Sequence, residues 1–276
     1  MQTSTTPGLD LATIKGRQQQ TWATGNYARV GNTLGLISEL LCEQVDVRAG
    51  DIVLDVATGS GTTALAAAHR FCAVTGIDYV PDLIDQANAR ANADGFEITF
   101  DVGDAEALPY QDASFDVVLS TLGAMFAPDQ PQTAAELLRV CRPGGKIGMA
   151  NWTPDGFIGQ FFRLMGRYVP PPAGLQSPIL WGTEARVREL FGEGIDGLSV
   201  TKRDFTFRYP SARFFRDYFQ TYYGPTNKAF ATLDADTQQV LAAEIEALVR
   251  QFNRSNDETM VVPSEYLEVV AIRAET

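Results

Sequence analysis

The chain has 276 residues, of which 45% are hydrophobic and 20% charged, and this composition suits a packed globular protein rather than a disordered one. Its formal net charge is −12 at pH 7, so it lacks the basic surface that binds phosphate backbones, and we expect no nucleic-acid partner. The N-terminal residues are polar and no apolar run approaches the roughly 20 residues that cross a bilayer, so we expect a cytoplasmic protein with no membrane span.

Residues 1–47 are predicted to form an N-terminal helical lid. From about Asp10 to Val47 the pattern indicates two helical segments. In the second segment, apolar residues such as Leu34, Ile37 and Leu41 recur at helical spacing. We expect these helices to pack against the domain that follows.

Residues 48–153 are predicted to form the core domain, because short β-branched runs alternate here with helical stretches. This alternation is typical of βαβ units and of a parallel sheet. Pro and Gly lie at the joints between the segments. The five strand-like runs are DIVLDVAT, AVTGIDY, EITFDVGD, FDVVLSTL and KIGMANW.

Residues 154–276 are predicted to add the last strands of the core and an inserted, aromatic helical cap. Two further strand-like runs, VTKRDFTFRY and YLEVVAIRA, flank helices across residues 211–253. One stripe of this region, Phe214, Tyr218 and Tyr222, is interpreted as the core of the cap, with a binding pocket as the alternative. The whole pattern predicts a Rossmann-like, doubly wound α/β fold of about seven mostly parallel strands, with an antiparallel strand near the C-terminus.

A glycine-rich turn is the strongest functional signal. In VLDVATGSGTTALAAA, a buried strand leads into Gly59, Ser60 and Gly61 and then into a helix. Glycines allow the tight turn and a close approach to a ligand, and the helix start offers free N–H groups. A structural turn is the alternative when such a turn stands alone.

Two acidic residues give this turn its context. Asp55 ends the first strand, and Asp78 ends the next one, 23 residues further on. That separation is close to the roughly 20 residues expected between a glycine loop and a carboxylate that binds ribose hydroxyls. An ionised carboxylate can accept both vicinal hydroxyls in strong hydrogen bonds. An N-cap role in the next helix is the alternative for Asp78.

The same glycine pattern could serve a nicotinamide or flavin dinucleotide, since Gly59, Gly61 and Ala64 satisfy the dinucleotide fingerprint. Asp55 argues against this alternative, because it would add a negative charge close to a pyrophosphate. A ligand with a cationic amino-acid tail would instead gain from that charge. An oxidoreductase that uses NAD(P) or a flavin therefore stays open as a second hypothesis.

The chain resembles class I S-adenosylmethionine (SAM)-dependent methyltransferases across residues 50–153. VLDVATGSGT resembles the first motif of that family, GIDYVPDLIDQA its ribose segment, and GDAEALPYQDASFDVVLS its adenine segment and fourth strand. LLRVCRPGGKIGMANW resembles the helix, turn and fifth strand that follow. The ALPY-x-x-x-SFD stretch is similar to the group that includes ubiquinone and menaquinone C-methyltransferases and natural-product O-methyltransferases.

This resemblance implies SAM as the cofactor and assigns parts of it to particular residues. Asp55 and the loop would hold the methionine portion, Asp78 the ribose, Tyr79 one face of the adenine, and Asp104 with Ala105 its edge. Family members often close an N-terminal helix over the cofactor, which makes Trp22 and Tyr27 lid candidates. The expected cofactor-binding residues are Trp22, Tyr27, Asp55, Ala57, Thr58, Gly59, Gly61, Asp78, Tyr79, Asp104, Ala105, Thr121 and Leu122.

The expected reaction is in-line methyl transfer to oxygen or carbon of a small, aromatic or hydrophobic molecule. Asn151 and Trp152 are the acceptor-side candidates, because they follow the fifth strand at its C-terminal end. No catalytic base is predicted, and the spacing of the acidic residues and of the single histidine predicts no metal site. A catalytically silent SAM-binding domain is a further alternative, and we expect a monomer or a homodimer.

Overall fold

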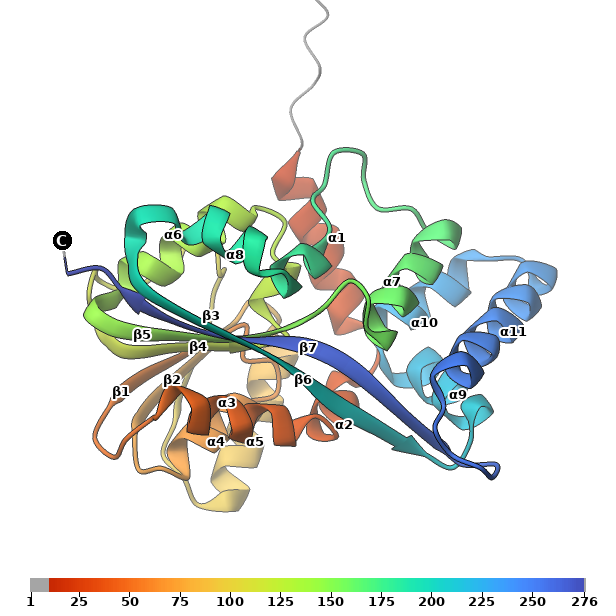
Figure 1. Ribbon diagram of the computed structural model, residues 1–276, viewed down its shortest axis with the longest axis horizontal. Coiled ribbons are helices and arrows are strands. Elements are labelled where there is room, and N and C mark those ends of the chain that lie inside the picture. Colours follow the sequence, from red (N-terminus) through yellow and green to blue (C-terminus); the bar gives the residue numbers. More distant parts are fainter. Residues whose placement is uncertain (1–9, 276) are drawn as a thin grey trace, which may run out of the picture.

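A single mixed β-sheet runs through the computed structural model, which describes residues 10–275 (Figure 1). The strand order is β3-β2-β1-β4-β5-β7-β6. Strands β1 to β5 are parallel, and β7 is antiparallel to both of its neighbours. The strands are β1 (Ile52–Val56), β2 (Ala73–Asp78), β3 (Thr99–Val102), β4 (Phe115–Thr121), β5 (Cys141–Trp152), β6 (Ile195–Tyr209) and β7 (Met260–Arg273). This arrangement confirms the predicted Rossmann-like α/β fold.

Helices cover both faces of this sheet. The α-helices are α1 (Leu11–Ala23), α2 (Tyr27–Asn32), α3 (Gly35–Val45), α4 (Thr62–Ala68), α5 (Pro81–Asp94), α6 (Gln130–Val140), α7 (Phe157–Tyr168), α8 (Glu184–Phe191), α9 (Ala212–Tyr222), α10 (Gly224–Thr232) and α11 (Ala235–Phe252). The 3-10 helices are η1 (Ala124–Phe126), η2 (Pro178–Gly182) and η3 (Gly192–Gly194). Figure 1 shows α3, α4 and α5 on one face and α6 with α8 on the other. Within residues 10–275, no helix has the length and apolar character needed to cross a membrane.

The central strands are buried on both faces, which explains their continuous apolar runs. In β1 and β4 the side chains of Val53, Leu54, Val118 and Leu119 are fully buried. Parallel strands with helices on both faces have this pattern because neither face meets water. The burial fixes the register of β1 between β2 and β4, so the C-terminal ends of these three strands lie together at one edge.

The N-terminal region contains three helices rather than the two predicted. The first predicted segment is divided into α1 and α2 at Gly25, whose φ is +108°. A Cβ at this position would lie 2.7 Å from the carbonyl oxygen of Tyr222, and that same oxygen accepts a hydrogen bond from Asn26 N at 3.1 Å. The break therefore forms where the lid contacts the end of α9.

Strands β6 and β7 carry the added helices. They pair from Ile195 and Arg273 at one end to Tyr209 and Met260 at the other, and they extend past the parallel strands (Figure 1). Helices α7 and α8 lie between β5 and β6 in the chain, whereas α9, α10 and α11 lie between β6 and β7. The region after residue 153 thus consists of two strands with two helical insertions.

The buried aromatic stripe of α9 differs from the predicted one. Phe215 and Phe219 are the buried residues, and Phe215 packs against Phe157 with ring centroids 5.4 Å apart. Phe214, from the stripe interpreted as the core of the cap, is 44% exposed. The prediction was wrong for Phe214 because both neighbouring stripes of this helix are aromatic, and only packing against α7 and β6 distinguishes them.

Candidate functional site

A cavity lies at the C-terminal edge of β1, β2 and β4, the edge at which open α/β sheets bind ligands. It contains about 970 Å³ of empty space, part of which is open solvent at its mouth. Its walls come from the lid helices, the glycine loop, the ends of β2 and β4, and η1. The predicted cofactor residues that line it are Trp22, Tyr27, Ala57, Thr58, Gly59, Asp78, Tyr79, Asp104, Ala105, Thr121 and Leu122.

Asp55 and Gly61 do not line the cavity, and the structure shows what they do instead. The Asp55 carboxylate is 1% exposed and accepts hydrogen bonds from Ala64 N, at 3.0 Å, and from the Thr58 hydroxyl. Gly61 has φ +81°, and a Cβ there would lie 3.0 Å from the ring of Phe100. Asp55 therefore holds the glycine loop by hydrogen bonds, and Gly61 lets the loop pack closely against Phe100.

Ala57 is held in a left-handed conformation, with φ +54°. A left-handed conformation costs an L-residue roughly 1–2 kcal/mol, and glycine avoids this cost. Gly123 lies against it so closely that a Cβ on Gly123 would be 2.9 Å from the Ala57 methyl group. The loop therefore accommodates a methyl group in the cavity wall at the expense of backbone strain.

We expect Ala57→Gly to raise the free energy of unfolding by up to about 1 kcal/mol, because strain relief exceeds the entropy gained by the unfolded chain. Chemical denaturation would measure the change. Ala113→Gly is a matched control, since Ala113 has φ +56° and is exposed outside the cavity wall. A loss of stability in Ala57→Gly alone would show that the packing of the methyl group outweighs the strain.

Asp78 joins the glycine loop to the end of β2. Its Oδ2 accepts a hydrogen bond from Gly59 N at 2.9 Å, and its Oδ1 accepts one from Val80 N at 3.0 Å. Each carboxylate oxygen keeps further acceptor capacity toward the cavity. Burial is the main cause that raises the pKa of Asp78 to about 6, and it raises that of Asp55 to about 7.

At one end of the cavity, Asp104 meets the lid. The ammonium group of Lys15, on α1, lies 2.6 Å from a carboxylate oxygen of Asp104 and 2.6 Å from one of Glu106. Gln19 of the same helix donates a hydrogen bond to the carbonyl oxygen of Tyr79. The lid therefore contacts the residues that the family resemblance assigns to the adenine. Sequence reasoning missed Lys15, although Lys15, Gln18 and Trp22 have the spacing of one helical face.

Aromatic side chains form the roof of the cavity. The ring centroid of Trp22 lies 5.5 Å from that of Tyr27, 5.1 Å from that of Phe126 and 5.6 Å from that of Tyr223. Trp22, Tyr27 and Phe126 line the cavity, and Tyr223 packs behind Trp22. The lid prediction for Trp22 and Tyr27 thus falls on residues that cover the site.

The end of β4 and helix α1 each place a buried polar atom against the cavity, and the residue after β4 has a strained backbone. The Thr121 hydroxyl oxygen is buried and has no hydrogen-bond partner among residues 10–275, and the same holds for Oε1 of Gln18. Leu122 adopts φ +54°. Buried polar atoms without partners are costly, so these two atoms fit a site that is completed by a polar ligand.

Asn151 and Trp152, predicted on the acceptor side, do not line this cavity. Both are buried, and Trp152 packs between Phe207 and Tyr266 at centroid distances of 5.9 and 6.3 Å. A Cβ on Gly182 of η2 would lie 2.0 Å from the carbonyl oxygen of Trp152. The end of β5 is thus covered by η2, and the geometry does not support an acceptor role for these residues.

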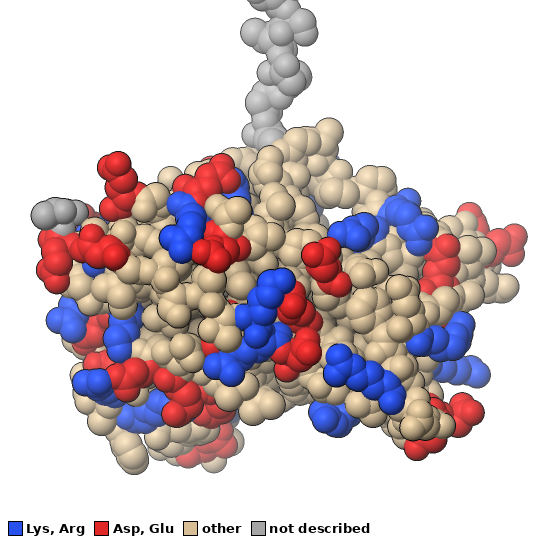
Figure 2. Space-filling view, viewed as in Figure 1, with Lys and Arg blue, Asp and Glu red and all other residues tan. Residues whose placement is uncertain are grey.

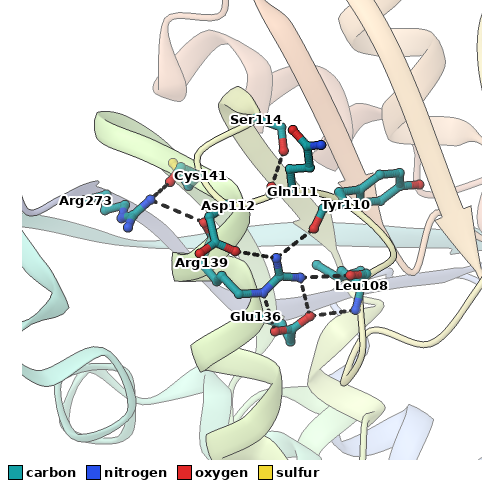
Figure 3. A network of polar contacts seen from close by, with 9 residues as sticks. All are labelled: Leu108, Tyr110, Gln111, Asp112, Ser114, Glu136, Arg139, Cys141 and Arg273. Atoms are coloured by element: carbon teal, nitrogen blue, oxygen red, sulfur yellow. Dashed lines mark hydrogen bonds and ion pairs between the residues drawn. The ribbon is translucent and has the colours of Figure 1, made fainter.

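A network of polar contacts fixes the loop that follows the adenine-side residues (Figure 3). Glu136 Oε2 accepts a hydrogen bond from Leu108 N at 2.6 Å. Arg139 donates to the carbonyl oxygens of Leu108 and Tyr110 at 2.8 and 2.7 Å, and it forms ion pairs with Glu136 and Asp112. The guanidinium group also holds the pKa of Glu136 below its usual value. Helix α6 therefore holds in place the loop that follows Asp104 and Ala105, which line the cavity.

Charged side chains of both signs are interspersed on the face shown in Figure 2, where neither sign forms a continuous patch. Among the described residues, no group of three or more His, Cys, Asp or Glu side chains could hold a metal ion. The candidate site is therefore the cavity and its own wall residues.

The fold and the cavity define an α/β protein with a candidate ligand site at the C-terminal edge of its sheet, and comparisons with known proteins identify the family. A family model described as a methyltransferase domain matches residues 53–145. An uncharacterised protein of Mycobacterium tuberculosis is 39% identical over 253 residues, covering 90% of this chain and 92% of that protein. The demethylmenaquinone methyltransferase of Deinococcus radiodurans is 40% identical over 126 residues, covering 44% and 52%.

Among solved structures, the YcgJ protein from Bacillus subtilis has a TM-score of 0.58 at 19% identity, covering 89% of this chain and 100% of that one, and shares the fold. The chain belongs to the class I SAM-dependent methyltransferases. SAM is therefore the cofactor, and the dinucleotide-dependent oxidoreductase alternative is set aside.

The two buried carboxylates predict a pH dependence of cofactor binding. Their pKa values of about 7 and about 6 mean that Asp55 and Asp78 are partly protonated in the free protein below neutral pH. A ligand with a cationic tail and hydroxyl donors favours the ionised carboxylates, so binding releases protons. We expect the affinity for SAM to rise by roughly five- to tenfold from about pH 5.5 to about pH 7.5. Calorimetry in buffers of different ionisation enthalpy would detect the released protons, and a pH-independent affinity would contradict this expectation.

Proposed function

We propose that this methyltransferase transfers the methyl group to oxygen or carbon of a small, flat or hydrophobic acceptor. The aromatic roof of Trp22, Tyr27 and Phe126 is the observation that carries the proposal. Aromatic walls bury large apolar areas and stack on flat ligands. The roof lies over the same cavity as Thr121 and Leu122, which the family resemblance places beside the reactive sulfur.

SAM supplies a methyl group that is already activated by its positive sulfur, so alignment of the acceptor is the main task of the protein. Burial raises the pKa of Tyr27 to about 12, which keeps its hydroxyl protonated at neutral pH and able to donate a hydrogen bond. The described wall residues include no histidine or cysteine, and Lys15 is already paired with two carboxylates. These features favour an acceptor that ionises readily, such as a phenol or an enol.

One relative supports this acceptor class. The similarity to the demethylmenaquinone methyltransferase of Deinococcus radiodurans concerns a protein named for a quinone acceptor. Because that similarity spans only 44% of this chain, it supports flat, quinone-like acceptors as a class and not one particular quinone.

A screen with isotope-labelled SAM tests the proposal. Purified protein would be incubated with a panel of demethylated quinones, simple phenols and polyketides, and methylated products would be found by mass spectrometry. Aliphatic amines and thiols serve as the comparison set. We expect methylated products only from the flat, acidic acceptors. Methylation of amines alone would overturn the proposal, and SAM binding without turnover of any acceptor would favour the catalytically silent alternative.

A further inference from the structure

Arg90 of α5 lies behind the part of the glycine loop that faces the cavity. Its Nη1 donates hydrogen bonds to the carbonyl oxygen of Ser60 at 2.6 Å, to the Ser60 hydroxyl at 3.2 Å and to the Thr62 hydroxyl at 3.0 Å. Ser60 and Thr62 both line the cavity, whereas Arg90 does not. One cation is thus bonded to two hydroxyl groups of the cavity wall.

The Arg90 side chain has different contacts from Lys15, the other cation at this site. The Lys15 ammonium group contacts two carboxylates. Arg90 is half-buried and, among the described residues, makes no ion pair within 4.0 Å; the acid whose charge acts on it is Asp94, four residues along α5. A partly buried cation bonded only to neutral oxygens leaves a local positive potential at the loop.

The hydrogen bonds also fix what the two hydroxyl groups can do. Because each hydroxyl oxygen accepts a hydrogen bond from the guanidinium group, its own O–H remains free to donate elsewhere. A nearby cation strengthens such a donor, and a carboxylate is the acceptor that gains most from it. Ser38 and Thr63, whose hydroxyls lie 2.9 Å apart, also line the cavity, so this part of the wall is rich in hydroxyl groups.

We propose that Arg90 is a positioning residue that presents the Ser60 and Thr62 hydroxyls, together with its own positive potential, to the carboxylate of the amino-acid tail of the cofactor. This inference rests on SAM binding and is independent of the acceptor proposed above. It gives the loop a positive element that balances the negative charges of Asp55 and Asp78, which both contact the same loop.

Three ligands with the same adenosine part separate this role from simple support of the loop. S-adenosylhomocysteine has both the ammonium and the carboxylate, its decarboxylated form has only the ammonium, and 5′-methylthioadenosine has neither. In Arg90→Gln we expect roughly tenfold weaker binding of S-adenosylhomocysteine. We expect less than about twofold change for 5′-methylthioadenosine, and equal or tighter binding of the decarboxylated ligand because a repulsive charge is removed. Titration calorimetry measures all three.

A second set of variants tests whether Arg90 acts through the hydroxyls. Thr62→Val should weaken S-adenosylhomocysteine binding in the wild-type background and have little further effect in Arg90→Gln, since coupled residues are non-additive. Arg90→Lys keeps the charge and should recover part of the lost affinity, and thermal melting controls for folding. Asp94→Asn, which leaves the loop contacts of Arg90 in place, should keep the affinity unchanged or raise it.

Equal weakening of all three ligands in Arg90→Gln would overturn the proposal and make Arg90 a support of the loop. Unchanged binding of S-adenosylhomocysteine would overturn it as well. Failure of the wild-type protein to bind any of the three would overturn both this inference and the SAM site, whereas failure to methylate any acceptor would leave these binding results intact and count only against the proposed acceptor.

Discussion

Replacing Asp78 with alanine is expected to weaken SAM binding about a hundredfold, which corresponds to about 2.7 kcal/mol. Its carboxylate lines the cavity and accepts hydrogen bonds from Gly59 N and Val80 N. The variant would lose the acceptor for the ribose hydroxyls and would also free the loop N–H group, so both effects act in the same direction. Titration calorimetry with SAM and with S-adenosylhomocysteine measures the loss.

Asp82→Ala is the matched control for that variant. Asp82 is an exposed acid in the first turn of α5, only four residues further along, and it lies outside the cavity wall. The Asp82→Ala variant should bind SAM as tightly as the wild-type protein does. A more specific check compares adenosine with 2′,3′-dideoxyadenosine, because their difference in affinity should disappear in Asp78→Ala. A difference that persists would remove the ribose assignment.

Arg139→Met is expected to lower the free energy of unfolding by about 2–3 kcal/mol. The substitution leaves the Glu136 carboxylate, whose side chain is 10% exposed, without its cation. It also removes the hydrogen bonds to the carbonyl oxygens of Leu108 and Tyr110 (Figure 3). Urea denaturation measures the change, and added SAM should offset part of the loss because it binds the folded state and not the unfolded one.

Two further variants test the cause of that loss. Arg142→Met removes an arginine whose side chain is 56% exposed and which pairs with Asp116, so it should cost less than about 1 kcal/mol. Adding Glu136→Gln to Arg139→Met should recover part of the lost stability, because the unpaired charge is then removed. Stability of Arg139→Met within about 0.5 kcal/mol of wild type would mean that water replaces the network.

Local sequence patterns predicted the sheet and most of the cofactor side of the cavity. The runs that form β1 and β4 are short, apolar and flanked by Gly and Asp, and parallel pairing follows from the helices between them. Asp78, Tyr79 and Asp104 lie at or just after the ends of adjacent strands, so topology alone brings them to one edge. Such residues can be placed from sequence because each depends only on its own strand.

Contacts between distant segments were not predictable in the same way. Lys15 meets Asp104 across 89 positions of the chain, and nothing in either segment identifies the other. Asn151 and Trp152 were expected to follow the fifth strand, but they are the last two residues of β5, η2 packs against this end of the strand, and neither residue lines the cavity. The path of a long insertion decided this outcome, and hydrophobic periodicity carries no information about such a path.

The contact between Gly25 and Tyr222 links the lid to the helices that follow β6. Asn26 N donates to the carbonyl oxygen of Tyr222, and a Cβ on Gly224 would lie 2.2 Å from the carbonyl oxygen of Thr21. The break between α1 and α2 thus packs against the junction of α9 and α10, and the contact leaves no room for a side chain at Gly25 or Gly224. Because the two backbones touch at this joint, we expect motion of the lid to be coupled to motion of α9 and α10, so that a change in either segment would alter access to the cavity.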